Sequence, residues 1–247
     1  MPKLYDEYTD RNGNFNFNGE DSRDFGAIIT KAPDDEIPAR KSQAFAVPGR
    51  NGVILHQEDA WEDVARVYNV ALSVDEAADY SDMIDEFLAW LNSVKGYQRL
   101  EDNFKPDIFR LAYYNGGGEV KNNFLQYGEA SVPFTCRPEK FLKPGELPRP
   151  LTNGGTIENP TRYTAKPLLY IQGSGNVSIT INGATITAQI TNYIYIDCES
   201  MNAYRQASEN MNNKISGDFP TLAPGQSTFS TSGTITAATI TPRFYTI

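Results

Sequence analysis

Apolar and polar residues alternate along much of the chain, with the period of two that is typical of half-buried β-strands. Residues 64–74 and 130–136 lie in the first half and are rich in β-branched and aromatic side chains. In the second half, residues 177–190 alternate around Asn182-Gly183, a pair that supports the positive φ angles of a type I′ turn. We therefore predict two strands and one hairpin at these places.

Further segments of the strand type follow in the second half. Residues 192–197 and 234–244 continue the alternation, and nothing after residue 150 has the period of a helix. Several short strands at hairpin spacing within about a hundred residues are typical of an antiparallel sandwich. We predict that this half is all-β.

One segment has the helical period. Residues 79–94 carry apolar side chains at i, i+3, i+4 and i+7, which predicts a helix with one stripe facing the core. Asp79 or Ser81 can cap its first turn, and Gly96 suits its end. The stripe consists of Ile84, Phe87, Leu88 and Leu91.

A change in composition divides the chain. Residues 141–167 contain five prolines and three glycines, neither of which favours regular structure. We place a domain boundary near residue 150 and predict two domains, 1–145 and 151–247. The expected fold class is mainly β, with an N-terminal sandwich or barrel-like domain that has one α-helix and a C-terminal antiparallel sandwich.

The charge is divided in the same way. The net charge is −9, and residues 151–247 contain five basic and five acidic residues, so 17 of the 22 basic and 26 of the 31 acidic residues precede them. A chain of this kind lacks the basic stripe that binds DNA phosphates. Its acids are suited to line a passage that DNA traverses without adhering, or they serve as ordinary surface charge.

Several classes of protein do not fit the sequence. No stretch approaches the ~18 apolar residues of a membrane helix, and the first residues show no signal-peptide pattern, so we expect neither a membrane protein nor a Sec-secreted one. No GxSxG, Walker, GxGxxG or HExxH motif is present. Cys136 and Cys198 lack CxxC partners, so we expect both to be buried thiols. His56 has acidic residues near it in the sequence, and we expect it to be a solvated loop residue. We expect no enzymatic activity, no metal and no cofactor.

The sequence resembles the distal tail proteins of long-tailed bacteriophages, a family of siphovirus tail components. The resemblance is carried by several short segments that occur in the same order as in that family. None is specific alone, but their order, spacing and total length extend the resemblance over nearly the whole chain. The segments are residues 17–26, 47–52, 132–141, 159–161, 165–167, 171–175, 181–183, 217–225 and 241–244.

Two of these segments also have turn chemistry. Pro48-Gly49 matches a type II turn, and Asn51-Gly52 is a second turn pair. Such motifs either shape the loops of one protomer or present contacts to another. The candidate ring or partner contacts are Asn18, Gly19, Asp24, Phe25, Gly26, Pro48, Gly49, Arg50 and Gly52.

The resemblance implies a structural role in a phage tail. It implies that the first domain forms a hexameric ring and that the second is a galectin-like sandwich outside it. The implied partners are copies of this chain, the tail tube protein, a tape-measure-linked tip protein and receptor-binding or baseplate proteins, with DNA passing through the lumen. The implied location is the distal end of the tail in the virion, after synthesis in the host cytoplasm.

Other functions remain open at this point. A carbohydrate-binding module would use surface tyrosines of the second half, namely Tyr163, Tyr193, Tyr195 or Tyr204. A glycoside hydrolase would need two carboxylates in a cleft. A tail-tube subunit is closer in class, because ring-forming tail proteins can share a fold.

Overall fold

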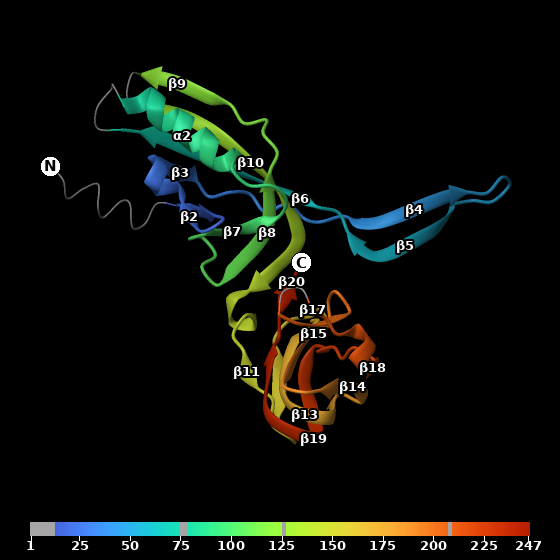
Figure 1. Ribbon diagram of the computed structural model, residues 1–247. Helices are drawn as coiled ribbons and strands as arrows, with labels where there is room; N and C mark the ends of the chain where they lie inside the picture. Colours follow the sequence, from blue (N-terminus) through green and yellow to red (C-terminus); the bar gives the residue numbers. More distant parts are fainter. Residues whose placement is uncertain (1–12, 75–78, 125–126, 207–208) are drawn as a thin grey trace. The chain divides into compact units, whose positions relative to one another are not determined.

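The computed structural model describes residues 13–74, 79–124, 127–206 and 209–247. The chain forms two compact units (Figure 1). The first comprises the residues up to Lys140 together with Ile247, and the second runs from Phe141 to Thr246. Each unit has its own cluster of buried apolar side chains.

The N-terminal unit is built on one β-sheet and a separate hairpin. The sheet strands follow the order β2-β1-β7-β8-β10-β6-β3, with β9 paired on β10. The strands of the sheet are β1 Phe15–Phe17, β2 Glu20–Asp21, β3 Ala27–Lys31, β6 Val64–Ser73, β7 Gln98–Asp102, β8 Ile108–Tyr114, β9 Val120–Phe124 and β10 Tyr127–Leu142. The hairpin consists of β4 Arg40–Ala46 and β5 Val53–Trp61, which pair only with each other among the described strands.

Strands β6 and β10 confirm the predicted strands at 64–74 and 130–136. They pair antiparallel from Tyr127↔Ser73 to Cys136↔Val64, and alternate residues of both are buried. The buried residues of the two strands are on one face of the sheet, where they form the core with α2 and the aromatic rings of β1. The residues between them form the opposite, outer face.

Helix α2, Tyr80–Asn92, confirms the predicted helix, but its buried stripe is rotated from the predicted one. Ile84 and Leu88 are only partly buried. The side chains that sequence periodicity missed are Tyr80 and Trp90. The Trp90 ring stacks on that of Phe25, with centroids 4.4 Å apart. The fully buried residues of the helix are Tyr80, Phe87, Trp90 and Leu91.

The predicted capping of this helix is wrong. Asp79 has αR backbone angles and makes no capping hydrogen bond, while Ser81 lies inside the helix. At the other end the amide of Ser93 donates to the Trp90 carbonyl, and Gly96 follows with a φ of 73°. The tertiary contacts of Trp90 and Phe87 therefore stabilise the helix more than its N-cap does.

The C-terminal unit is an antiparallel β structure that surrounds an isoleucine-rich core. Its strand order is β11-β19-β13-β15-β16-β17, with β12 on β19 and β14 between β13 and β18. The strands are β11 Arg149–Pro150, β12 Thr156–Asn159, β13 Leu168–Ile181, β14 Ala184–Ile190, β15 Tyr193–Asp197, β16 Asn202–Arg205, β17 Glu209–Asn210, β18 Ile215–Gly217 and β19 Gly225–Thr241. The short strand β20, Tyr245–Thr246, pairs with β10.

Strands β13 and β14 confirm the predicted hairpin at residues 177–190. Their register runs from Gly175↔Ile190 to Ile181↔Ala184. Asn182 and Gly183 between them have φ angles of 50° and 88°, as a type I′ turn requires. The predicted strand at 192–197 corresponds to β15. Strand β19 begins nine residues before residue 234, where the sequence predicts a strand to start, because it pairs along most of β13.

The division between the units falls at Lys140 and Phe141. The segment after it belongs to the C-terminal unit because the Leu142 amide donates to the Phe244 carbonyl at 2.9 Å and the Arg243 amide to the Gly145 carbonyl at 2.8 Å. Leu151 is buried in the C-terminal core. The proline-rich segment is therefore attached to the second unit by hydrogen bonds and packing.

Candidate assembly surfaces

The β4–β5 hairpin projects from the N-terminal unit as an arm (Figure 1). We use "the arm" for residues 40–61. Its end is the segment 47–52, where the Arg50 amide donates to the Val47 carbonyl at 3.2 Å and Gly49 has a φ of 77°. These values fit the predicted type II turn at Pro48-Gly49. Four of the nine predicted contact residues thus lie together at the exposed end of the arm.

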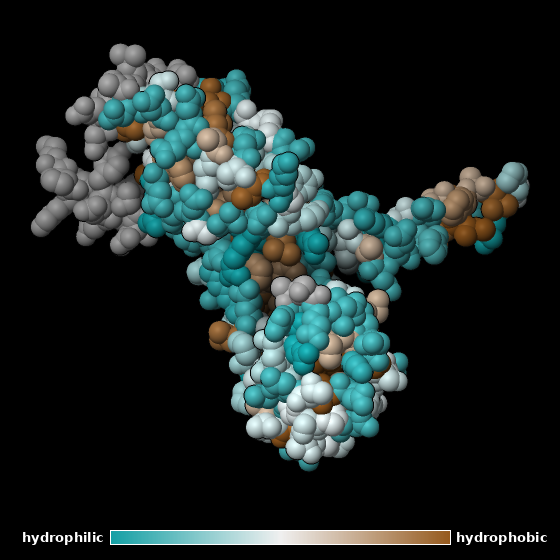
Figure 2. All heavy atoms as spheres, in the orientation of Figure 1, coloured by the Kyte–Doolittle hydropathy of each residue, from teal (hydrophilic) through white to brown (hydrophobic). Residues whose placement is uncertain are grey.

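The arm exposes large apolar side chains instead of burying them. Every residue of β4 and the first seven of β5 are exposed. Hydrophobic side chains gather near its outer end (Figure 2). The large ones are Phe45 at 53%, Val53 at 58%, Ile54 at 50% and Leu55 at 53% exposure. A two-stranded hairpin is marginal by itself in water, and a contiguous exposed apolar patch marks an interaction surface.

The apolar residues occupy both faces of the arm. The register pairs Phe45 with Ile54 and Ala44 with Leu55, so these two pairs point to opposite faces. One face, the wider one, consists of Ala44, Ala46, Val53 and Leu55. The other carries Phe45 and Ile54. Since neither face contacts the body of the unit, the arm offers two apolar faces to other molecules.

An ion-pair network holds the segment that leads into the arm. The Asp35 carboxylate accepts from the Arg66 guanidinium at 2.7 Å and from Arg110 at 3.2 Å, and it also pairs with Lys105. Partial burial disfavours the charged form of Asp35 and by itself would raise its pKa. The hydrogen bond from Lys105 and the positive charges of Lys105, Arg66 and Arg110 have the larger effect, so the pKa of Asp35 is lowered. Glu36 adds a hydrogen bond from the Ala65 amide at 2.5 Å.

This network continues into the core. Arg66 is 3% exposed and its guanidinium donates to the Asp102 carboxylate at 2.8 Å, while the Tyr68 hydroxyl donates to the same oxygen at 2.9 Å. The side chain of Asp102 is 1% exposed. A buried charge is tolerated only when it is paired and hydrogen-bonded, so these three residues form one unit. The network fixes the root of the arm to the sheet.

The other five predicted contact residues lie around the β1–β2 turn and the 3-10 turn that follows it. Asn18 and Gly19 are exposed at the turn, with φ angles of 55° and 90°. Phe25 is only 9% exposed and belongs to the core, and Gly26 ends the 3-10 turn, where a Cβ would lie 2.7 Å from the Ser73 carbonyl oxygen. Asn18, Gly19 and exposed Asp24 therefore remain contact candidates, whereas Phe25 and Gly26 have internal structural roles.

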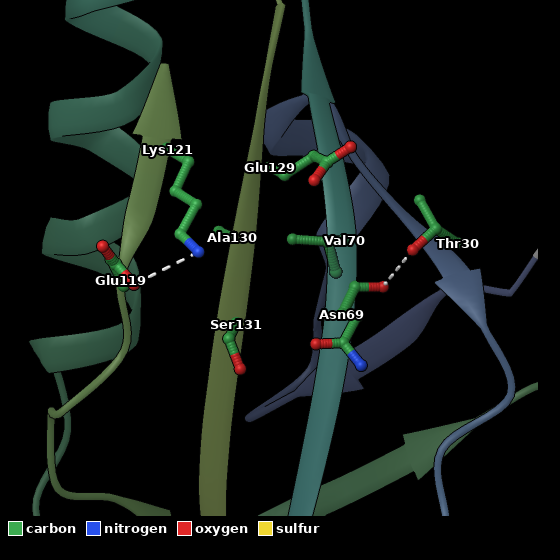
Figure 3. Close-up of a pocket in the computed structure, with 8 residues that line it drawn as sticks. All are labelled: Thr30, Asn69, Val70, Glu119, Lys121, Glu129, Ala130 and Ser131. Atoms are coloured by element: carbon green, nitrogen blue, oxygen red, sulfur yellow. Dashed lines mark hydrogen bonds and ion pairs between the residues drawn. The ribbon is translucent and has the colours of Figure 1, made fainter. Parts of the chain in front are cut away.

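The outer face of the sheet is a second surface, on which Ala65, Val67 and Asn69 of β6 are exposed and Ser131, Pro133 and Thr135 of β10 are half-buried. A hollow of about 220 Å³ lies on it, lined mainly by polar side chains from β3, β6, β10 and the β9 region (Figure 3). Within it the Thr30 hydroxyl donates to the Asn69 carbonyl at 3.1 Å, and Lys121 and Glu119 form an ion pair at 3.6 Å. A second hollow of about 250 Å³ is lined by residues 31–36 and by Ala65, Val67 and Asn69.

The C-terminal unit has a row of tyrosines across three strands. Tyr170, Tyr195 and Tyr204 are cross-strand neighbours, with ring centroids 5.0 Å and 5.4 Å apart. The Tyr195 and Tyr204 rings are stacked, with 15° between their planes, so each covers a face of the other. Tyr193 joins the group, but predicted Tyr163 stacks on Tyr245 instead. Sugars stack on free aromatic faces, and stacking of Tyr195 on Tyr204 removes one face of each of these two rings.

The residues that could carry chemistry do not converge. His56 is exposed on the arm opposite Gln43. Cys136 and Cys198 are buried and unpaired, as predicted, and burial raises the pKa of both thiols to about 12. No group of three or more His, Cys, Asp or Glu side chains among the described residues could hold a metal ion. None of the described helices is long and apolar enough to span a membrane.

Comparison with known proteins finds a family match for most of the N-terminal unit. Residues 19–136 match the model of the phage tail protein RIFT-related domain. No curated protein sequence matches the chain. The match begins at Gly19 in the β1–β2 turn and includes the whole arm.

The full fold is similar to that of a distal tail protein. One match is the crystal structure of the SPP1 Dit (gp 19.1) protein, which is described as a paradigm of the hub adsorption apparatus in phages that infect Gram-positive hosts. It has a TM-score of 0.75 and 10% sequence identity, and the match covers 95% of this chain and 99% of that one. Two structures of the phage P2 baseplate in its activated conformation, with Ca and with Sr, match with TM-scores of 0.48 and 0.49 at 9% and 10% identity, each over 93% of this chain and 97% of theirs. The resemblance to siphovirus distal tail proteins is thereby confirmed, and the mainly β fold class with it.

Proposed function

We propose that this protein is the structural hub at the distal end of a phage tail, where six copies close into a ring. The observation that carries the proposal is the arm, whose two apolar faces are exposed in the single chain. A protein that acted alone would not maintain such a surface, because it gains no burial energy from it. The phage tail domain and the Dit-like fold support the same reading.

In this proposal the protein works by geometry. The N-terminal unit forms the ring, and each copy presents two different surfaces to its two neighbours, as cyclic symmetry requires. The ring joins the tail tube protein to a tape-measure-linked tip protein and to receptor-binding or baseplate proteins. The C-terminal unit, proposed to be galectin-like, lies outside the ring and holds adsorption components. The location would be the tail tip of the virion, after synthesis in the host cytoplasm.

The charge of the chain suits a lumen that DNA crosses. Since the first 150 residues carry the whole net charge of −9, acidic side chains facing the lumen would repel DNA over the ~8–10 Å Debye length. A structure of the assembled ring tests this point directly. A lumen lined mainly by lysine and arginine would contradict it.

The test of the hub is the particle formed by the purified full chain. We expect discrete six-fold rings by negative-stain electron microscopy and six copies per particle by mass photometry. Long tubes would identify a tail-tube subunit, and particles of another copy number would contradict the hexamer. Carbohydrate binding has less support because Tyr195 and Tyr204 cover one face of each other's rings, and a cell-wall glycan array with the full chain would reveal it.

A further inference from the structure

Six asparagines of the chain are followed directly by glycine. Such an asparagine loses its side-chain amide readily, because glycine has no Cβ to keep its backbone nitrogen away from the asparagine side chain. Asn12, in the first of these pairs, lies outside the described residues. The other five pairs are Asn18-Gly19, Asn51-Gly52, Asn115-Gly116, Asn153-Gly154 and Asn182-Gly183.

The reaction needs only water. The backbone nitrogen of the glycine gives up its proton to hydroxide and attacks Cγ of the asparagine. The new C–N bond closes a succinimide ring, the bond from Cγ to the side-chain nitrogen breaks, and ammonia leaves after taking a proton from water. Water then adds to either carbonyl of the ring and opens it to aspartate or isoaspartate. Both the glycine amide and the asparagine side chain must therefore be free to move.

Hydrogen bonds hold both pairs of the C-terminal unit. The Gly154 amide donates to the Phe229 carbonyl at 2.9 Å, and the Asn153 side-chain oxygen accepts from a backbone amide of β19 at 3.1 Å. The Asn182 side chain donates to the Ser227 hydroxyl at 2.9 Å and accepts from another backbone amide of β19 at 3.1 Å. Both asparagine side chains are therefore fixed, so neither pair closes a ring without local unfolding.

The pair at the β1–β2 turn is held as well, although both of its residues are exposed. The Gly19 amide donates to the Asn16 side-chain oxygen at 3.0 Å. The Asn18 amide donates to the Arg99 carbonyl at 2.9 Å, which fixes the backbone just before the glycine. The attacking nitrogen is thus occupied. Protection at Asn18 comes from hydrogen bonding and not from burial.

The pair at the end of the arm has no such restraint. Asn51 and Gly52 are both exposed, and neither the Asn51 side chain nor the Gly52 amide forms a hydrogen bond to the described residues. A Cβ at Gly52 would lie more than 4 Å from any other atom, so the turn is open to solvent. Asn115 and Gly116 also lack hydrogen bonds of this kind to the described part of the chain. The same criterion therefore selects two of the five pairs.

We propose that Asn51 is a site of spontaneous deamidation, which gives the unassembled chain a limited lifetime. The product carries a new carboxylate beside the exposed apolar side chains of Val53 and Ile54. The isoaspartate form also moves the Asn51 β-carbon into the main chain and so lengthens the turn that sets the register of β4 with β5. Both changes alter the apolar end of the arm. The effect on assembly rests on the proposed hub function, whereas the modification itself does not.

Mass spectrometry of the folded full-length chain tests the site. The chain is incubated at mildly alkaline pH, which promotes loss of the glycine N–H proton, and is then digested with pepsin at low pH, where the reaction is slow. We expect deamidation at Asn51 to be about tenfold faster than at any of the three hydrogen-bonded pairs. A rate at Asn51 no greater than that at Asn18 would overturn the proposal.

Two controls separate the effect of structure from that of sequence. In concentrated urea all five pairs lose their hydrogen bonds, so their rates should become similar. Asn16→Ala removes the acceptor of the Gly19 amide and should raise the rate at Asn18 in the folded chain toward that at Asn51. A rate at Asn18 that Asn16→Ala leaves unchanged, or that stays low in urea, would overturn this account of protection.

Separation of particles from single chains tests the effect on assembly. A partly deamidated preparation is concentrated, fractionated by size and analysed at residue 51. We expect modified chains to be about tenfold rarer in the particles than in the single-chain fraction. Equal proportions would overturn the limited lifetime and leave both the site and the hub intact. A fresh preparation that forms no particles would overturn the hub and the lifetime together, while the rates measured by mass spectrometry still decide the site.

The matched variant is Asn51→Ser, which cannot form a succinimide at this position. Its capacity to form particles should be the same before and after the incubation, whereas that of the wild type should fall as Asn51 is modified. A loss of capacity in Asn51→Ser as rapid as in the wild type would overturn the role of this residue.

Discussion

The arm β4–β5 and the hairpin β13–β14 are both antiparallel ribbons closed by turns with glycine at positive φ. In β13–β14 the apolar residues share one face, so Val177, Ile179 and Ile181 are at most 1% exposed. In the arm they occupy both faces, and Phe45, Val53, Ile54 and Leu55 stay exposed. The same local rules thus produce a hairpin that completes its own core and one that requires another molecule.

Because one hairpin is buried in its unit and the other is not, equivalent substitutions should have unequal effects on stability. The largest difference is expected for a buried isoleucine of β13. Ile179→Ala removes a side chain that is 0% exposed, and a cavity of this kind costs about 2–5 kcal/mol. Chemical denaturation followed by a C-terminal-unit probe measures the loss. Thr187→Ala, at an exposed position of β14, is the control and should change the free energy of unfolding by less than about 0.5 kcal/mol.

The two turns offer a second comparison. Gly183 and Gly49 have φ angles of 88° and 77°, and neither would place a Cβ within 4 Å of another atom. Alanine at each position therefore costs only the strain of the left-handed conformation, about 1–2 kcal/mol. We expect Gly183→Ala to lower the free energy of unfolding by this amount. Gly49→Ala should leave global unfolding unchanged and instead increase amide hydrogen exchange in the arm. An equal loss in both variants would contradict the independence of the arm.

A smaller effect on stability is expected at the apolar end of the arm. Leu55→Ser removes an exposed side chain, so the free energy of unfolding of the single chain should change by less than about 0.5 kcal/mol. The same substitution should abolish ring formation, as seen by mass photometry. Lys41→Ser, a change at another exposed residue of the arm, is the control and should retain the rings. Rings formed equally by Leu55→Ser would exclude a role for this side chain in assembly.

The smallest effect concerns the root of the arm and its pH dependence. The pKa of Asp35 is lowered in the folded chain from the ordinary 3.8, so its ion pairs stabilise the fold above pH 3.8 and this contribution is lost as the pH falls through the lower value. The difference in the free energy of unfolding between the wild type and Asp35→Asn should therefore shrink on acidification. Asp34→Asn, which removes an exposed carboxylate, should show little difference at any pH. A difference for Asp35→Asn that stays constant down to pH 2 would contradict this account.

The sequence predicted those parts of the fold that depend on neighbouring residues. Asn182-Gly183 determines its turn by local φ preference, and the alternation of Val64 to Leu72 identifies the strand and its buried face. Trp90 was missed because its burial depends on Phe25, 65 positions earlier in the chain, and not on the period of the helix. The failed cap at Asp79 has the same origin, since packing of α2 replaces capping.

The candidate surfaces were predictable only in part. The turn chemistry at 47–52 located the end of the arm, and the uninterrupted Val53-Ile54-Leu55 run is a signal that could have revealed its two apolar faces. The network of Asp35, Arg66 and Asp102 joins residues more than 30 positions apart, so spacing along the chain carries no sign of it. The outer face was equally hidden, because its members are ordinary small residues until pairing of β6 with β10 brings them together.

The number of copies in each particle of the purified full-length protein tests the central claim most directly. Mass photometry should give a single species of six chains, which changes to single chains when Val53 and Leu55 are both replaced by serine. A wild-type protein that remains a single chain at all concentrations, or one that grows into open-ended tubes, would contradict the account.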